Sequence, residues 1–393
     1  MSETQVQASV LHGAKDLRLE SRSLPSPSAS EVQIAVHSTG LCGSDLHYYA
    51  HNRNGDILVR EPLTLGHESS GVVVSTGSDP ASSGVSLKPG DRVALEVGIP
   101  CSSCGYCSSD RYNICPNLRF RSSAKSFPHF QGTLQGRINH PAAFCHVLPE
   151  NMSMAEGALL EPLGVALHAW RRSGLDKLTE GERKGVSVVV FGAGAVGCLC
   201  AGVARMKGVG RVVVADIDEG RVGFAVEKGF ADKGVVLGTK RGASVDEGLE
   251  IAKGAAEKVK SEGGLEGVGV TFECTGVQAC VQAGIYATSP GGKVMLVGMG
   301  NPIQTLALSA AALREVDLVG VFRYANTYPE SIELVSRKAK GDPDFASLVT
   351  HTVKGLDSAV SGFELASKTK DESGKLVMKV VIETPEGQVN GTH

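Results

Sequence analysis

The chain has 393 residues, of which 42% are hydrophobic and 21% are charged, and its formal net charge is −3. This length is too great for one hydrophobic core and predicts two domains. The mildly acidic charge and the lack of a basic run argue against nucleic acid or an anionic membrane as a partner. No apolar run reaches the roughly 18 to 20 residues of a membrane span, and the polar start does not resemble a signal peptide. We therefore expect a cytoplasmic protein.

The first 90 residues or so predict short strands separated by turns, which is the pattern of a β-rich domain. The clearest strand candidates are Val32–Val36, Gly71–Ser75 and Asp91–Leu95. Two groups of reactive side chains lie on the turns, Cys42-Gly-Ser-Asp-Leu-His47 and Gly66-His67-Glu68. By themselves a cysteine and a histidine this far apart prove little, because buried structural cysteines are common.

Four of the ten cysteines crowd into one short stretch, at Cys101, Cys104, Cys107 and Cys115. In a cytosolic chain such crowding indicates a metal rather than disulfides. Four thiolates complete the tetrahedral coordination of zinc and leave no position for water, so we predict a structural zinc site. A zinc ribbon that binds nucleic acid is the alternative, and the missing basic patch opposes it.

From about residue 186 onward, apolar strands alternate with helical stretches, which predicts a parallel, doubly wound sheet and an α/β fold. The strand candidates are Val186–Phe191, Arg211–Ala215, Val268–Phe272 and Lys293–Val297. A Lys/Glu-rich stretch over residues 243–264 is predicted to form a solvated surface helix. A last strand candidate, Leu376–Ile382, closes the chain.

The first of these strands runs into Gly192-Ala-Gly194-Ala195-Val196-Gly197, followed by a helical stretch. These glycines permit the tight turn, the approach of a pyrophosphate and close helix packing, and the helix N-terminus favours phosphate. Asp216 ends the second strand, where an acid accepts hydrogen bonds from the ribose of NAD and repels the 2′-phosphate of NADP. An ordinary solvated aspartate is the alternative. We predict NAD binding by the glycines, Ala195, Val196, Asp216, Ile217 and Arg221, although Arg221 could equally lie on the surface.

Gly66-His67-Glu68-x-x-Gly71, followed by Gly77, resembles the zinc signature of the medium-chain alcohol and polyol dehydrogenase family, and the Cys101 to Cys115 spacing is similar to that family's structural-zinc lobe. Further stretches are similar to its sorbitol, xylitol and arabinitol branch: Cys42–Tyr48, Glu161–Leu163, Asp216–Arg221, Glu273–Gly276 and Phe322–Thr327. The resemblance implies a GroES-like catalytic domain of residues 1–165 and 322–393, interrupted by a Rossmann NAD-binding domain of residues 166–321. It also implies a homotetramer.

The same resemblance implies a catalytic zinc bound by Cys42 and His67. Glu161 stands where simple alcohol dehydrogenases have a cysteine, and Glu68 is either a direct ligand or bound through water, so the two carboxylates could exchange roles. A catalytic zinc keeps an open position, where it lowers the pKa of a bound alcohol. Ser44 is similar to the hydroxyl that begins the family's proton relay.

Other roles follow from the resemblance in the same way. His47 would carry the proton to solvent or be a plain surface histidine, and Asp45 would orient His67. The residues implied to contact a polyol are Tyr48, Phe130, Arg323 and Tyr324.

We therefore expect NAD-dependent oxidation of sorbitol or xylitol at a secondary hydroxyl to the ketose. L-Arabinitol 4-dehydrogenase is the alternative, and Phe322 is more similar to the sorbitol and xylitol members. A non-enzymatic NAD-binding scaffold is a different class, and the complete Cys, His and Glu set opposes it.

Overall fold

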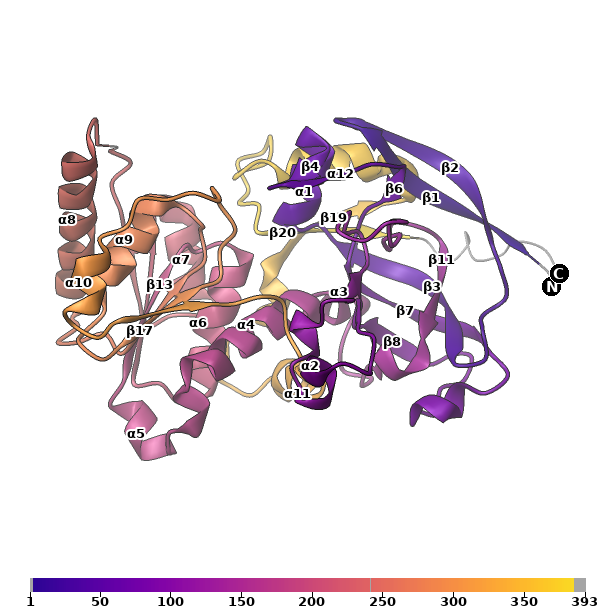
Figure 1. Ribbon diagram of the computed structural model, residues 1–393, viewed down its shortest axis with the longest axis horizontal. Coiled ribbons are helices and arrows are strands. Elements are labelled where there is room, and N and C mark those ends of the chain that lie inside the picture. Colours follow the sequence, from indigo (N-terminus) through magenta and orange to yellow (C-terminus); the bar gives the residue numbers. More distant parts are fainter. Residues whose placement is uncertain (1–2, 241, 385–393) are drawn as a thin grey trace. The chain divides into compact units, whose positions relative to one another are not determined.

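The computed structural model describes residues 3–240 and 242–384, and these form two compact units (Figure 1). The first unit runs to Glu161 and also includes Tyr328–Arg337 and the chain from Leu348 onward. The second unit consists of Pro162–Thr327 and Lys338–Ser347. Within the described residues no helix is long and apolar enough to cross a membrane.

These boundaries differ from the expected ones, which gave all of residues 322–393 to the first domain. In the structure residues 322–327 and 338–347 stay with the second unit. The physical reason is tertiary contact, because Asp344 N donates to Lys228 O at 2.9 Å and the rings of Phe230 and Phe345 lie 5.8 Å apart.

The first unit is built mainly from antiparallel strands. Its strands are β1 (Thr4–Gly13), β2 (Asp16–Leu24), β3 (Glu31–Gly40), β4 (Arg53–Asn54), β5 (Ile57–Leu58), β6 (Leu63–Thr64), β7 (Glu68–Thr76), β8 (Arg92–Leu95), β9 (Gly98–Ile99), β10 (Arg119–Phe120), β11 (Arg137–Pro141), β12 (Cys145–Val147), β19 (Val349–Lys354) and β20 (Lys379–Glu383). Its helices are α1 (Gly43–His51), α2 (Gly105–Ser108), α3 (Met154–Ala158), α11 (Tyr328–Arg337) and α12 (Ala359–Ala366). The largest sheet has the order β12-β8-β7-β3-β20-β19, with β11 also paired to β3.

The middle of this sheet places the C-terminal strand beside the N-terminal ones. Strand β3 pairs with β7 on one side and with β20 on the other, and both pairings are antiparallel. Apolar side chains on these strands are buried, including Ile34, Val73 and Val381. Because burial on one face fixes the strand register, the pairing Gly40↔Glu68 and the start of β20 are held at the same end of the sheet.

The second unit contains a six-stranded parallel sheet. Its strands are β13 (Ser187–Phe191), β14 (Arg211–Asp216), β15 (Lys233–Val236), β16 (Val270–Glu273), β17 (Lys293–Leu296) and β18 (Asp317–Gly320). Its helices are α5 (Glu180–Lys184), α6 (Ala195–Met206), α7 (Glu219–Glu227), α8 (Val245–Gly263), α9 (Gln278–Ala287) and α10 (Leu308–Ala312), preceded by α4 (Leu160–Ser173), which begins in the first unit. The order β15-β14-β13-β16-β17-β18 is that of a doubly wound Rossmann sheet.

Helices cover both faces of the parallel sheet, with α8 and α9 on one side and α6 on the other (Figure 1). One core cluster packs Phe191 and Val213 of the sheet against Ala256 of α8 and Ala287 of α9. The stretch predicted as a solvated helix is α8, capped by the Ser244 hydroxyl, which accepts from Glu247 N at 3.2 Å. Its charged side faces solvent while its small residues pack on the sheet.

Short 3-10 segments complete the described chain. They are η1 (Pro80–Ser83), η2 (Tyr112–Ile114), η3 (Ala142–Phe144), η4 (Leu175–Lys177), η5 (Phe345–Leu348) and η6 (Leu356–Ser358).

Candidate active site and zinc centres

The structure brings three of the predicted catalytic-zinc ligands together. Cys42 caps the N-terminus of α1, and Glu68 begins β7 directly after His67. One ligand atom from each of Cys42, His67 and Glu68 lies within 4.8 Å of the other two. His67 and Glu68 are buried and Cys42 is half-buried. A thiolate, an imidazole and a carboxylate in this spacing fit a zinc ion with an open position.

Two glycines allow this arrangement. Gly66 has φ +91°, a left-handed conformation that a side chain would strain, and it turns the chain so that His67 points into the site. Gly40 lies opposite Glu68 in the sheet, and a Cβ atom there would stand 2.3 Å from Glu68 Oε2. The Glu68 carboxylate therefore needs the space that Gly40 leaves.

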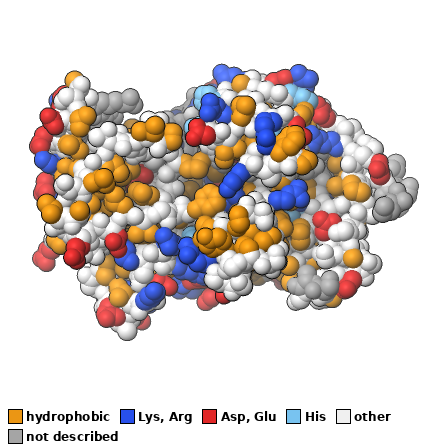
Figure 2. Space-filling view, viewed as in Figure 1, with side chains coloured by type: hydrophobic (Ala, Val, Ile, Leu, Met, Phe, Trp, Pro, Cys, Tyr) orange, Lys and Arg blue, Asp and Glu red, His pale blue; other side chains and the backbone are white. Residues whose placement is uncertain are grey.

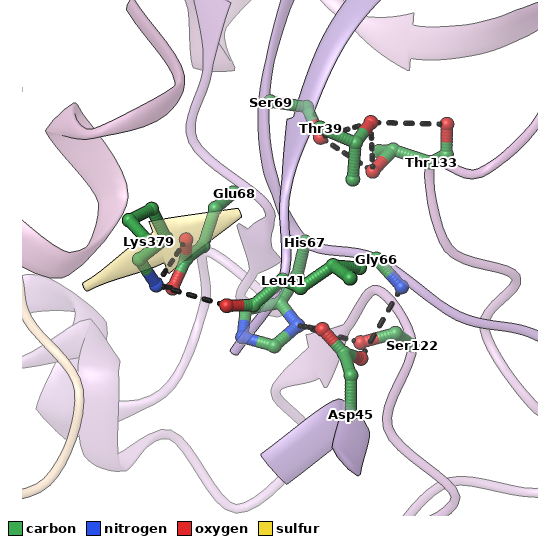
Figure 3. Close-up of polar contacts among 10 residues, drawn as sticks. All are labelled: Thr39, Leu41, Asp45, Gly66, His67, Glu68, Ser69, Ser122, Thr133 and Lys379. Atoms are coloured by element: carbon green, nitrogen blue, oxygen red, sulfur yellow. Dashed lines mark hydrogen bonds and ion pairs between the residues drawn. The ribbon is translucent and has the colours of Figure 1, made fainter. Parts of the chain in front are cut away.

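The imidazole of His67 has two partners on its Nδ1 side. Nδ1 lies 2.8 Å from Ser122 Oγ and 3.2 Å from Asp45 Oδ2 (Figure 3). Asp45 is buried in α1 and also accepts from Gly66 N at 3.2 Å, so it holds the turn as well as the ring. Such contacts fix the tautomer and leave Nε2 for a metal. Burial alone lowers the pKa of His67, but the charges of Asp45 and Cys42 outweigh it and raise the pKa well above its usual value.

Glu68 has a buried cationic partner, Lys379, at the start of β20. Lys379 Nζ lies 2.8 Å from each carboxylate oxygen of Glu68 and donates to Leu41 O at 3.0 Å (Figure 3). Burial lowers the pKa of Lys379, but the negative charges of Glu68 and Cys42, with a smaller contribution from Glu161, raise it overall. Within the part of the chain described, Glu68 Oε2 has no aligned hydrogen-bond donor. A buried oxygen in this condition fits a metal ligand.

The remaining predicted catalytic residues lie on helices α4 and α1. Glu161 is buried in α4, and its charge acts on Lys379, but it is not in the three-residue set whose ligand atoms lie within 4.8 Å. Ser44 lies half-buried in the first turn of α1. His47 is exposed on the same helix, with its ring 6.1 Å from that of His51. The relay and ligand roles of Glu161, Ser44 and His47 remain predictions.

The four clustered cysteines form a compact thiol set. Their sulfur atoms all lie within 4.8 Å of one another, including 3.5 Å for Cys104 to Cys107 and 3.5 Å for Cys115 to Cys101. Tetrahedral zinc with bonds of about 2.3 Å needs sulfur atoms about 3.8 Å apart, so this set fits zinc closely. Hydrogen bonds from Ser103 lower the pKa of Cys101 to about 5, which favours a thiolate there.

A buried carboxylate anchors the loop that carries these cysteines. Glu96 accepts from the hydroxyl of Tyr112 at 2.5 Å and lies 2.9 Å from Nε2 of His146. Tyr112 lies in η2, between Cys107 and Cys115. The loop is therefore tied to the sheet of the first unit by these side-chain contacts.

In the second unit, the glycine-rich turn has the shape that a dinucleotide needs. Gly192 has φ +96°, and a Cβ atom on Gly197 would lie 1.7 Å from Gly192 O, so helix α6 packs against the turn without room for a side chain. Ala195 and Val196 begin α6. Asp216 accepts from Ala193 N at 2.6 Å and from Asp218 N at 3.0 Å. Its carboxylate is thus fixed beside the turn, which fits recognition of a ribose.

The neighbours of Asp216 are placed differently. Ile217 is exposed, and Arg221 approaches the turn, with its Nη1 atom 3.9 Å from the position of a Cβ on Gly194. The N-terminus of α6 and this guanidinium suit phosphate oxygens.

The predicted substrate residues lie in both units. In the first unit the buried Tyr48 hydroxyl accepts from Ala124 N at 3.2 Å. The Phe130 ring lies under two guanidinium groups, at 4.5 Å from Arg119 and 4.4 Å from Arg121, so it packs within its own segment.

In the second unit Arg323 has φ +51°, and its guanidinium lies 4.8 Å from the centre of the Phe322 ring. Tyr324 is buried, and Gly164 permits its close approach, since a Cβ there would lie 3.2 Å from Tyr324 Cγ. Left-handed backbone at a non-glycine residue is uncommon and is often found at functional sites.

Comparison with known proteins identifies the family. Residues 28–150 match the alcohol dehydrogenase GroES-like domain, and residues 195–337 match the zinc-binding dehydrogenase domain. Sorbitol dehydrogenase from Homo sapiens is 42% identical over 359 residues, which cover 91% of this chain and 92% of that protein. The chain belongs to the zinc-dependent medium-chain dehydrogenase family. Sorbitol dehydrogenase from Gallus gallus is similar as well, at 40% identity over 95% of this chain and 96% of that one.

Solved structures share the fold of this dehydrogenase. An oxidoreductase of unknown specificity from Escherichia coli has a TM-score of 0.79 and 30% identity, covering 97% of this chain and 100% of its own. The 2R,3R-butanediol dehydrogenase from Bacillus subtilis has a TM-score of 0.75 and 26% identity, covering 96% and 99%. The predicted fold, the predicted polyol branch of the family, and the zinc and nicotinamide cofactors are confirmed.

Sequence reasoning missed two residues of the site, Ser122 and Lys379. The signal for Lys379 was present, because it is the single charged residue within the apolar stretch Leu376–Ile382. A lone charge in a buried strand needs a partner. Ser122 gave no such signal, since it is one of many serines in a polar segment.

Proposed function

We propose that this dehydrogenase oxidises a secondary hydroxyl group of xylitol or D-sorbitol to the ketone, with NAD as the hydride acceptor. The observation that carries the proposal is the 40–42% identity with sorbitol dehydrogenases over 91–95% of the chain. The ligand set of Cys42, His67 and Glu68 supports it, because a carboxylate among the ligands gives a harder and more labile site than a second thiolate.

In this proposal the site residues of the first unit have the following tasks. A bound zinc supplies a Lewis acid that lowers the pKa of an alcohol, and NAD takes up the hydride. Cys42 and His67 hold the ion, and Glu68 and Glu161 provide exchangeable carboxylates. The Ser44 hydroxyl would take up the alcohol proton as it gives up its own, and the exposed His47 would take up the proton that Ser44 releases and pass it to solvent.

The preference for NAD rests on Asp216. Its carboxylate is fixed by Ala193 N beside the glycine-rich turn, where it accepts hydrogen bonds from ribose hydroxyls and repels a 2′-phosphate. Gly192, Gly194 and Gly197 leave space for the pyrophosphate, and Arg221 provides a cation near it.

Polyol contacts are assigned to side chains with hydrogen-bonding capacity. The Tyr48 hydroxyl, which accepts from Ala124 N, keeps its own hydrogen for a substrate hydroxyl. Arg323 and Tyr324 provide further polar groups, and Phe130 acts through the segment that it orders with Arg119 and Arg121.

We further propose a homotetramer in the cytoplasm. All ten cysteines are free thiols, which fits a reducing compartment.

In the second unit β18 is an edge strand, and hydrophobic side chains gather over the region of α9 and α10 (Figure 2). Ile303 is 88% exposed and Leu313 87%, which favours an interface with further copies.

A panel of polyols tests the proposal. The purified enzyme with NAD should oxidise xylitol and D-sorbitol with kcat/KM values well above that for L-arabinitol. A tenfold preference for L-arabinitol would overturn the substrate assignment and favour an L-arabinitol 4-dehydrogenase. Native mass measurement tests the tetramer in the same preparation.

A further inference from the structure

The contact between Lys379 and Glu68 joins two strands that are far apart in the sequence. Strand β20 pairs with β3, and β3 pairs with β7, so the first residue of β20 meets the first residue of β7 across one intervening strand. The Lys379 ammonium lies 2.8 Å from both Glu68 oxygens and 3.0 Å from Leu41 O. Leu41 directly precedes the proposed zinc ligand Cys42. The same ammonium therefore contacts Glu68 and the residue next to Cys42.

This contact is shut off from water. Lys379 is 5% exposed and Glu68 is 1% exposed. On another side the carboxylate packs against Gly40, where even a Cβ atom would collide with Oε2. Two opposite charges held in such a place attract each other strongly, and removing one leaves the other buried without compensation.

The charges around the ligand set show why a fixed cation is needed there. Cys42 as a thiolate, Glu68, Asp45 and Glu161 supply four negative charges at or near the site, and zinc supplies two positive ones. When zinc is absent, Lys379 is the cation in contact with Glu68. When zinc is present, the ammonium and the ion attract the same carboxylate.

We propose that Lys379 is a positioning residue with two linked effects. It keeps the metal-free site folded by compensating Glu68, and it competes with zinc for that carboxylate and so makes the catalytic zinc easier to release. Glu68 Oε1 is occupied by an aligned hydrogen bond from Nζ, while Oε2 lacks an aligned donor among the described residues. Oε2 is therefore the oxygen that binds the metal. The ammonium of Lys379 determines how much negative charge Oε2 presents to that metal. The inference rests on the proposed use of Glu68 at the zinc.

The test uses the zinc-loaded full chain and measures metal release and unfolding rather than turnover. Lys379→Met keeps most of the side-chain volume and removes the charge, whereas Lys379→Arg keeps the charge. An opposite charge at this distance changes the proton affinity of a carboxylate roughly 10- to 1000-fold. We expect a comparable competition for zinc. Release of the first zinc to a chelator should be at least about tenfold slower in Lys379→Met, and close to wild type in Lys379→Arg.

Thermal unfolding provides the second readout. The Tm of the metal-free protein should fall in Lys379→Met, and the rise in Tm on adding zinc should be larger than in wild type. The control is Glu68→Gln, in which no carboxylate charge remains to be shared. In that background Lys379→Met should alter zinc release by less than about twofold.

Three results would overturn the proposal. The first is a folded Lys379→Met protein that releases zinc as fast as wild type or faster. The second is an equal effect of Lys379→Met with and without Glu68. The third applies if Lys379→Met does not fold, in which case the doubly neutral protein Glu68→Gln with Lys379→Met should fold, and its failure would contradict a counter-ion role. None of these readouts depends on which polyol is oxidised.

Discussion

Ser122 Oγ lies closer to His67 Nδ1, at 2.8 Å, than the carboxylate of Asp45 does, at 3.2 Å. The ring of a proposed zinc ligand is therefore held by two partners from different parts of the first unit, helix α1 and the segment after β10. The Ser122 contact has hydrogen-bond geometry, whereas the Asp45 carboxylate contributes a charge contact on the same side of the ring.

Removal of the serine hydroxyl should weaken the hold on the ring without breaking it. Loss of a partner to a ligating histidine typically costs 10- to 100-fold in metal affinity. Because Asp45 remains in Ser122→Ala, we expect a loss at the low end, about tenfold, in zinc affinity at the catalytic site. The matched control is Ser123→Ala, since the hydroxyl of Ser123 accepts from Lys125 N instead. Equal zinc affinities in the two variants would show that Asp45 alone orients the ring.

The two zinc sites should respond differently to mutation. We expect two zinc ions per chain by elemental analysis, because the sequence and structure offer one four-thiol set and one mixed set. Cys104→Ser should lower Tm and zinc content, since a structural site contributes to folding. Cys42→Ser should abolish turnover while the far-ultraviolet circular dichroism spectrum stays unchanged. The opposite pattern would exchange the two assignments.

Cofactor preference should follow the charge at the end of β14. Asp216→Ser combined with Ile217→Arg removes the repulsion of a 2′-phosphate and adds a partner for it, so the ratio of kcat/KM for NAD to that for NADP should fall and could invert. The exposed position of Ile217 makes the arginine easy to accommodate. A wild-type enzyme that already uses both cofactors equally would contradict the assignment of Asp216 to the ribose.

Polyol recognition should depend on Arg323. A buried hydrogen-bonding group left without a partner costs about 1 to 3 kcal/mol, so Arg323→Ala should lower kcat/KM for xylitol by roughly 10- to 100-fold. The loss for 2-propanol should be far smaller. Alanine and arginine both carry a Cβ atom, so the left-handed backbone at this position is not further strained. Equal losses on both substrates would mean that Arg323 supports the fold or the cofactor.

The sequence predicted those parts of the site that lie in local motifs. His67 and Glu68 are adjacent, the glycine-rich turn is contiguous, and the four cysteines share one loop, so spacing alone was informative. Ser122 and Lys379 meet their partners through long-range contacts, 55 and 311 residues away. Local periodicity carries no information on such contacts.

The fold shows the same division. The alternation of apolar strands and helices predicted the parallel sheet, because its central strands β13, β14 and β16 are buried on both faces. Residues 338–347 return to the second unit because Phe345 contacts Phe230. The sequence pattern of that short segment does not predict this long-range contact.

The most direct test of the central claim is NADH formation with xylitol or D-sorbitol before and after removal and return of zinc. With NAD, the zinc-loaded enzyme should oxidise both polyols with kcat/KM at least about a hundredfold above that for ethanol, as expected when two polar contacts are lost with the small alcohol. Activity should disappear when a chelator has removed the catalytic zinc and return when zinc is added. Full polyol oxidation by protein that holds no zinc, or equal kcat/KM for ethanol and the polyols, would contradict the account.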